Sequence, residues 1–267
     1  MKTSIGGRNV RFANSAMDID RDAPGLVFLH GAGMDHSMWQ LQSRYFAHHG
    51  FRSIAVDLPG HGKSEGPPLE SVEALADWTA EIIDKLEVGP AHVVGHSLGS
   101  LIALELAGSR PELVRSLVLL GTAAELPVND SLLKIAATDQ HRAGQLMTSW
   151  SHDPKTHRGG HDVPGYWQLG SSIHLIDRCP EDVLSTDLHA CNNYEGGLSA
   201  AERISARTTI IVGLGDRMSR PGQIEPLLTN IADVEVVEIA GAGHMAMIEA
   251  SAAVRTALAN AFAHGAG

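Results

Sequence analysis

The chain has 267 residues, 43% of them hydrophobic and 19% charged, which is enough to bury a full core and excludes a disordered protein. A formal net charge of -11 at pH 7, without a cluster of Lys and Arg, disfavours nucleic acid and anionic membrane surfaces as partners. No apolar run approaches the roughly 18 residues that a membrane span needs, and the start lacks a signal-peptide core, so we expect a cytoplasmic protein.

Six short runs of β-branched and aliphatic residues alternate with longer helical patterns. Continuous apolar runs of this length, separated by helices, are typical of strands that are covered on both faces of a parallel sheet. We therefore predict an α/β fold with a mostly parallel sheet, with room for an antiparallel pair within residues 3–19. The six runs lie at 26–30, 52–58, 91–96, 116–121, 208–213 and 234–239.

Two helices are predicted between these strands. Residues 71–86 carry apolar side chains near the 3.6-residue period, so one face of this helix should pack on the sheet. Residues 98–107 are apolar almost all round, which predicts a central, buried helix.

The alternation of strands and helices stops between Ala123 and Arg207. Proline and glycine break this stretch into short helical pieces. Structureless loops of such length are uncommon in compact domains, so the stretch should be an insertion with helices of its own, placed over the ligand-binding edge of the sheet. We expect residues 1–123 and 207–267 to form the core and residues 124–206 to form a helical cap.

A candidate nucleophile lies in Gly95-His96-Ser97-Leu98-Gly99, between a predicted strand and the apolar helix. A nucleophile elbow requires this context. A serine on so sharp a turn has a strained backbone, which is tolerated only if the residues two before and two after it lack side chains. Gly95 and Gly99 meet that condition, so Ser97 is predicted to be the nucleophile; the structural alternative is a helix cap.

A glycine-rich turn, His30-Gly31-Ala32-Gly33, follows the first predicted parallel strand. Acyl transfer needs two backbone N–H donors aimed at the oxyanion of the tetrahedral intermediate. One comes from the residue after the nucleophile, Leu98, and we assign the other to Ala32. An ordinary strand-to-helix turn is the alternative, and we expect His30 to be structural and Gly31 to contact substrate.

Two loops after later strands supply a carboxylate and a histidine. Asp216 follows the strand at 208–213, and His244 follows the last predicted strand. A neutral imidazole there can accept the serine proton and return it to the leaving group, with the carboxylate orienting the ring. We predict His244 as the base and Asp216 as the acid, with Glu125 and Glu225 as less suitable rivals.

Together these motifs resemble the α/β-hydrolase superfamily over nearly the whole chain outside the cap. The resemblance implies an eight-stranded, mostly parallel sheet with helices on both faces, a cap at about 124–206 and no cofactor. The order nucleophile, acid, histidine is that of the fold. By similarity Asp57 and His61 are structural, and serine at the elbow disfavours carbon-halogen and epoxide cleavage. The matching segments are HGAG at 30–33, Trp39, DLPGHGKS at 57–64, GHSLG at 95–99, GLGDRM at 213–218 and GAGHM at 241–245.

The cap is rich in histidine, but zinc sites usually show compact ligand spacing, and we expect no metal. Its aromatic and aliphatic residues suit a lid or the cap's own core; of these, Trp150 and Trp167 are candidate substrate contacts, together with Met245 of the core. Cys179 and Cys191 should be free thiols, because a chain of this size needs no disulfide. The histidines are His141, His152, His157, His161, His174 and His189, and the other apolar candidates are Tyr166, Leu169, Ile173 and Leu175.

The predicted function is hydrolysis of a carboxylic ester, lactone or thioester of a small to medium apolar substrate, through an acyl-enzyme on Ser97. Three alternatives remain open: cofactor-free peroxidation through a peracid, carbon-carbon bond hydrolysis with the same triad, and a non-catalytic ligand receptor. We expect a small-molecule substrate as the partner and a monomer or homodimer.

Overall fold

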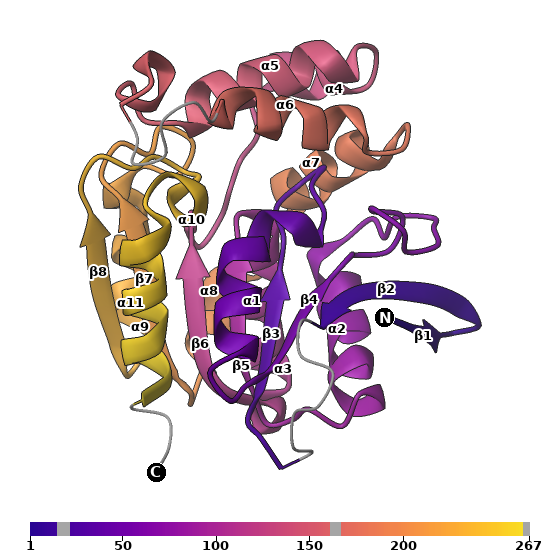
Figure 1. Ribbon diagram of the computed structural model, residues 1–267, viewed down its shortest axis with the longest axis vertical. Helices are drawn as coiled ribbons and strands as arrows, with labels where there is room; N and C mark the ends of the chain where they lie inside the picture. Colours follow the sequence, from indigo (N-terminus) through magenta and orange to yellow (C-terminus); the bar gives the residue numbers. More distant parts are fainter. Residues whose placement is uncertain (15–21, 161–166, 264–267) are drawn as a thin grey trace.

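The computed structural model describes residues 1–14, 22–160 and 167–263, and a single eight-stranded sheet lies at its centre (Figure 1). The strand order is β1-β2-β4-β3-β5-β6-β7-β8; β3 to β8 run parallel, and β2 pairs antiparallel with both β1 and β4. The predicted mostly parallel sheet and its N-terminal antiparallel pair are confirmed. The strands are β1 (Lys2–Ile5), β2 (Arg8–Asn14), β3 (Gly25–Leu29), β4 (Arg52–Val56), β5 (Ala91–His96), β6 (Val114–Leu120), β7 (Arg207–Gly213) and β8 (Val234–Ile239).

Helices cover both faces of the sheet and enclose two apolar cores. Successive side chains of a strand point to opposite faces, so Val27 and Leu29 of β3 join one core while Leu26 and Phe28 join the other. The first core packs under α2 (Val72–Lys85) and α3 (Leu98–Ser109), and the second under α1 (Gln40–Ala47) and α11 (Ser251–Ala263). The short helices are η1 (His36–Trp39), η2 (Pro111–Leu113), η4 (Pro221–Ile224), α9 (Glu225–Asn230) and α10 (Ala246–Glu249).

The two predicted helices form where the apolar pattern placed them. The Ser71 hydroxyl accepts a hydrogen bond from the Ala74 amide and caps α2 at its start. In α3 nearly every residue is buried, Glu105 and Ser109 being the exceptions, because this helix lies between the sheet and neighbouring helices. Among the described residues, no helix combines the length and apolar character needed to cross a membrane.

Between β6 and β7, the described residues form five α-helices. Helices α4 to α7 lie over the carboxyl ends of the parallel strands, whereas α8 lies beside α3 in the core (Figure 1). A Cβ at Gly108 of α3 would lie 2.6 Å from the Ala200 carbonyl oxygen of α8, which shows how closely the two backbones approach. Both cysteines in this stretch are buried free thiols, as predicted. The elements are α4 (Asp130–Ala136), α5 (Gln140–Ser151), η3 (Thr156–Arg158), α6 (Gln168–Asp177), α7 (Val183–Asn193) and α8 (Gly197–Ala201).

Candidate active site

Ser97 lies on the sharp turn between β5 and α3 with φ 54° and ψ -119°, a backbone conformation that a residue with a side chain rarely adopts. Such strain costs about 1–3 kcal/mol and persists only where the surroundings enforce it. A Cβ at Gly95 would overlap the Gly99 carbonyl oxygen, and one at Gly99 would overlap the carbonyl oxygen of Leu29. Both glycines are therefore required for the turn that exposes the Ser97 hydroxyl.

His244 and Asp216 form a buried hydrogen-bonded pair, with 2.8 Å between the histidine Nδ1 and the aspartate Oδ2. Burial alone would raise the pKa of Asp216, but the neighbouring His244 and the hydrogen bonds from Ser219 outweigh it and hold this pKa below its ordinary value. The carboxylate is therefore ionised and accepts the Nδ1 proton. With Nδ1 as the donor, the second ring nitrogen is Nε2, which is buried and has no hydrogen-bond partner within the described residues.

Gly121 and His96 also pack against the imidazole of His244. Gly121, the residue after β6, has φ 57°, and a Cβ there would lie 2.7 Å from the His244 Cε1. His96 Nε2 donates to the His244 carbonyl oxygen at 3.0 Å, and the two ring centroids are 4.7 Å apart. Burial lowers the pKa of His96 well below its ordinary value, so His96 supports the loop as a neutral ring.

The loop after β3 packs directly on the nucleophile. A Cβ at Gly31 would lie 3.3 Å from the Ser97 Cβ and 2.9 Å from His96 Nδ1, so only glycine fits there. Ala32 lines the same cavity as Ser97. Leu98 is the first residue of α3, where backbone N–H groups lack partners inside the helix. The structure thus brings both predicted oxyanion donors next to the elbow.

A cap residue that the sequence did not single out, Asp187 of α7, contacts this loop. Its Oδ2 accepts from the Gly33 amide and from His61 Nε2, each at 2.8 Å. The other ring nitrogen of His61 faces the Pro59 carbonyl oxygen at 3.1 Å, so both nitrogens face acceptors and the ring is cationic. Burial would lower the pKa of His61, but Asp187 outweighs it and raises this pKa.

A second buried carboxylate, Glu249 of α10, joins the cap to the loop that carries His244. It accepts from the Gly243 amide at 2.8 Å, the Asp153 amide at 2.8 Å and the Thr156 hydroxyl at 2.6 Å. Burial raises the pKa of Glu249. Gly243, the residue before His244, is therefore hydrogen-bonded to the same side chain as Asp153 and Thr156.

A cavity of about 190 Å³ lies above Ser97 and His244, between the sheet edge and the cap. Trp150 lines it, while Gly31 and Met245 line a smaller recess of about 20 Å³ that also contains Ser97 and His244. The structure does not bring Trp167 to either space: its side chain is 70% exposed, because it precedes α6 and packs over Gly170. The remaining lining residues are Ala32, Leu126, Pro127, Val128, Asn129, Leu132, Met147, Leu188, Cys191, Arg217, Met218 and Gln223.

Neither rival acid lines these spaces. Glu125 and Glu225 are exposed side chains, and Asp216 is the carboxylate bonded to His244. The predicted cap residues His161 and Tyr166 lie outside the described residues. Of the residues that sequence reasoning missed, Ser219 is the one that a local pattern could have revealed. An aspartate commonly accepts hydrogen bonds from the backbone amides two and three residues later, as Asp216 does from Met218 and Ser219.

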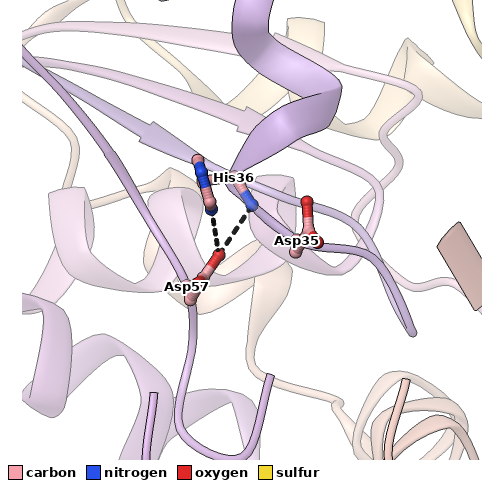
Figure 2. Close-up of side chains that lie close together, drawn as sticks. All are labelled: Asp35, His36 and Asp57. Carbon is pink, nitrogen blue, oxygen red and sulfur yellow. Dashed lines mark hydrogen bonds and ion pairs between the residues drawn. The ribbon is translucent and has the colours of Figure 1, made fainter. Parts of the chain in front are cut away.

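Within the described residues, three potential metal ligands lie close together: Asp35, His36 and Asp57 (Figure 2). His36 donates to Asp57 Oδ1 from its backbone amide at 2.9 Å and from Nδ1 at 2.6 Å, and Lys63 N donates to Oδ2 at 3.0 Å. Asp35 accepts from the amide and hydroxyl of Ser37. Because the carboxylate oxygens already accept these hydrogens, the cluster joins the loops after β3 and β4 and is not arranged to hold a cation.

The sequence and the structure were compared with those of known proteins. The sequence matches the model of the alpha/beta hydrolase family over residues 26–257. It is 29% identical to BpoC of Mycobacterium tuberculosis, whose name proposes a non-heme bromoperoxidase, across 94% of this chain and 98% of BpoC. It is 38% identical to (E)-2-((N-methylformamido)methylene)succinate hydrolase of Acinetobacter baylyi, but over only 36% of each chain. The structure is similar to that of a thermophilic esterase, with a TM-score of 0.81 and 26% identity across 100% of this chain and 98% of the esterase.

Proposed function

This chain belongs to the alpha/beta hydrolase family, and from that premise we propose that it is a serine hydrolase that cleaves a carboxylic ester, lactone or thioester. One observation carries the proposal: His244 lines the same cavity as the strained Ser97, with its Nδ1 hydrogen-bonded to Asp216 and its Nε2 without a partner among the described residues. A base and a hydroxyl in this arrangement suit nucleophilic catalysis.

In the proposed reaction, the Ser97 Oγ bonds to the substrate carbonyl carbon while His244 Nε2 takes the hydroxyl proton. Asp216 stabilises the imidazolium that forms, and the amides of Leu98 and Ala32 donate to the oxyanion. The carbonyl re-forms, the carbon-oxygen bond to the leaving group breaks, and His244 passes its proton to that oxygen. Water, deprotonated by His244, then attacks the acyl-enzyme, releases the acid and restores the Ser97 hydroxyl.

The cavity supports a small substrate with an apolar acyl part. Its volume of about 190 Å³ is below the roughly 300 Å³ at which pockets for drug-sized ligands begin. Most of its wall is aliphatic or aromatic, with Leu126, Leu132 and Trp150 among the contributors. Burial of an apolar acyl chain against this wall would stabilise the bound ester.

Replacement of the nucleophile tests the proposal. We expect Ser97→Ala to lower kcat for p-nitrophenyl esters by more than about 10³-fold, because the covalent step is lost. The same variant should not be labelled by a fluorophosphonate, whereas the exposed helix variant Ser109→Ala should behave like the wild type. Unchanged ester turnover in Ser97→Ala would refute the assignment, and a wild type that is neither labelled nor active would favour a ligand receptor.

The full-length similarity to BpoC favours one second candidate, cofactor-free perhydrolysis. Here Ser97 would form the acyl-enzyme from a carboxylic acid, releasing water, and hydrogen peroxide would replace water in the second step to give a peracid. Peroxide-dependent bromination of a dye in the presence of acetate, lost in Ser97→Ala, would support this reaction. Ester turnover without any such bromination would exclude it.

A further inference from the structure

The cavity above the elbow has a polar rim with an unusual composition. Apart from Ser97 and His244, its polar lining residues are Asn129, Arg217 and Gln223, all exposed at its edge. Asn129 precedes α4 in the cap, Arg217 follows the catalytic acid, and Gln223 lies in η4. The rim is therefore built from both the cap and the core.

In each of the two amide side chains, the oxygen accepts a hydrogen bond from a nearby backbone amide. Asn129 Oδ1 accepts from the Ser131 backbone amide at 2.8 Å, and Gln223 Oε1 accepts from the Arg220 backbone amide at 2.7 Å. A backbone amide nitrogen can only donate, so these contacts identify the oxygen of each side chain and leave its NH₂ group free.

Arg217 is the one Lys, Arg, Asp or Glu that lines the cavity in the part of the chain that the structure describes. Its guanidinium carries five N–H donors and no acceptor, and it has no hydrogen bond or ion pair within the described part of the chain. Among the described residues, no Asp or Glu lines the cavity, although the chain has 31 acidic and 20 basic residues. The rim therefore presents donors and one positive charge over an otherwise apolar wall.

We propose that this rim binds a carboxylate at the far end of the substrate, so that the preferred substrate is an ester or lactone with a free terminal carboxylate. This inference rests on the proposed function and specifies its substrate class. The planar fork of Arg217 matches a carboxylate in two parallel hydrogen bonds, and the amides of Asn129 and Gln223 can donate to its remaining lone pairs. One positive charge with two neutral donors balances a monoanion, whereas a phosphate dianion would leave uncompensated charge.

Two esters of matched size test the subsite: mono-p-nitrophenyl adipate, with a terminal carboxylate, and p-nitrophenyl 6-oxoheptanoate, with a methyl ketone in its place. We expect the wild type to prefer the anionic ester in kcat/KM after correction for spontaneous hydrolysis. Arg217→Gln should reduce kcat/KM for the anionic ester about tenfold, mainly through KM, because a charge-assisted hydrogen-bonded pair at an exposed rim is lost. The neutral ester should be cleaved as before.

Arg220→Gln is the matched control, because Arg220 is exposed on the same loop but does not line the cavity. Arg220→Gln changes the net charge by the same amount as Arg217→Gln and should keep the preference for the anionic ester. Arg217→Lys should keep part of that preference. If wild type and Arg217→Gln showed the same ratio of kcat/KM for the anionic and neutral esters, with the neutral ester still cleaved, the carboxylate subsite would be overturned and the proposed function would stand. Cleavage of neither ester would overturn the proposed function with it, and stronger competitive inhibition by inorganic phosphate than by adipate would overturn the carboxylate assignment.

Discussion

Ser219 lies at the junction of the acid and the base of the candidate triad. Its hydroxyl donates to Asp216 Oδ2 at 2.8 Å and lies 3.3 Å from His244 Nδ1, while its backbone amide donates to Asp216 Oδ1 at 2.9 Å. The Met218 amide donates to the same oxygen at 2.8 Å. Ser219 therefore orients the carboxylate without touching the reacting atoms, which makes it a positioning residue.

Loss of the Ser219 hydroxyl should weaken that orientation. We expect Ser219→Ala to lower kcat for a neutral p-nitrophenyl ester by about threefold to tenfold, since one net hydrogen bond contributes about 1 kcal/mol. KM should change little, because the side chain is absent from the cavity lining. Steady-state kinetics beside Ser149→Ala, an exposed serine of α5, would measure this, and an unchanged kcat would contradict the role.

At the scale of elements, helix α7 of the cap supports the glycine loop after β3. Asp187 accepts from the Gly33 amide, and Leu184, one turn earlier, packs where a Cβ of Gly33 would lie. Gly33 has φ 66°, so its amide can face the cap while its neighbour Ala32 lines the reaction cavity. The cap thus helps to set the loop that we propose as half of the oxyanion hole.

Asp187→Asn should disturb this loop while keeping the size of the side chain. The variant replaces a buried carboxylate with a neutral amide beside the cationic His61, so we expect kcat to fall about tenfold or more. The kcat for the neutral ester should fall more than KM rises, because loop position affects the oxyanion more than ground-state binding. Thr186→Val, at a neighbouring half-buried position of α7, is the control; a pure KM effect in Asp187→Asn would argue against loop support.

At the scale of the whole molecule, the His61 and Asp187 pair joins cap and core through a buried contact. The pKa of His61 is raised in the folded protein, so its pairing contributes stability that is fully present below the unfolded pKa of about 6.5. This contribution is lost as pH rises through the folded pKa. The cap should therefore be held most firmly on the acidic side of neutrality.

The stability difference between wild type and His61→Gln should therefore decrease as pH rises. We expect the gap in Tm to be largest near pH 6 and to narrow as pH rises through the raised pKa of His61, as measured by thermal unfolding in a series of buffers. His141→Gln removes a surface histidine paired with Asp177 and should show no comparable trend. A gap that widens with rising pH would contradict the cationic state of His61.

Local sequence was sufficient to predict the parallel strands, α2 and α3, and it singled out Ser97, Asp216 and His244. Each lies directly after a strand, and strand ends of a parallel sheet meet at one edge, so their proximity followed from periodicity and chain order. Trp167 was predicted to contact substrate, but its side chain is exposed. The exposure of a cap side chain depends on how the helices pack, which periodicity does not determine.

Other supporting residues could not be found this way, because their partners are distant in sequence. Asp187 is 126 residues from His61 and 154 from Gly33, and Glu249 is 96 residues from Asp153. An isolated acidic residue in a helix predicts a solvated side chain. Only the packed structure shows that these carboxylates are buried and hydrogen-bonded to those partners.

The sequence by itself determined the sheet, the strained elbow and the chain order of three chemical groups, because backbone sterics and burial on both faces act over a few residues. Tertiary structure alone decided that Asn129, Arg217 and Gln223 line one cavity together with Ser97 and His244. A shared cavity arises only when the cap packs over the core, since its lining residues come from segments that no local pattern brings together.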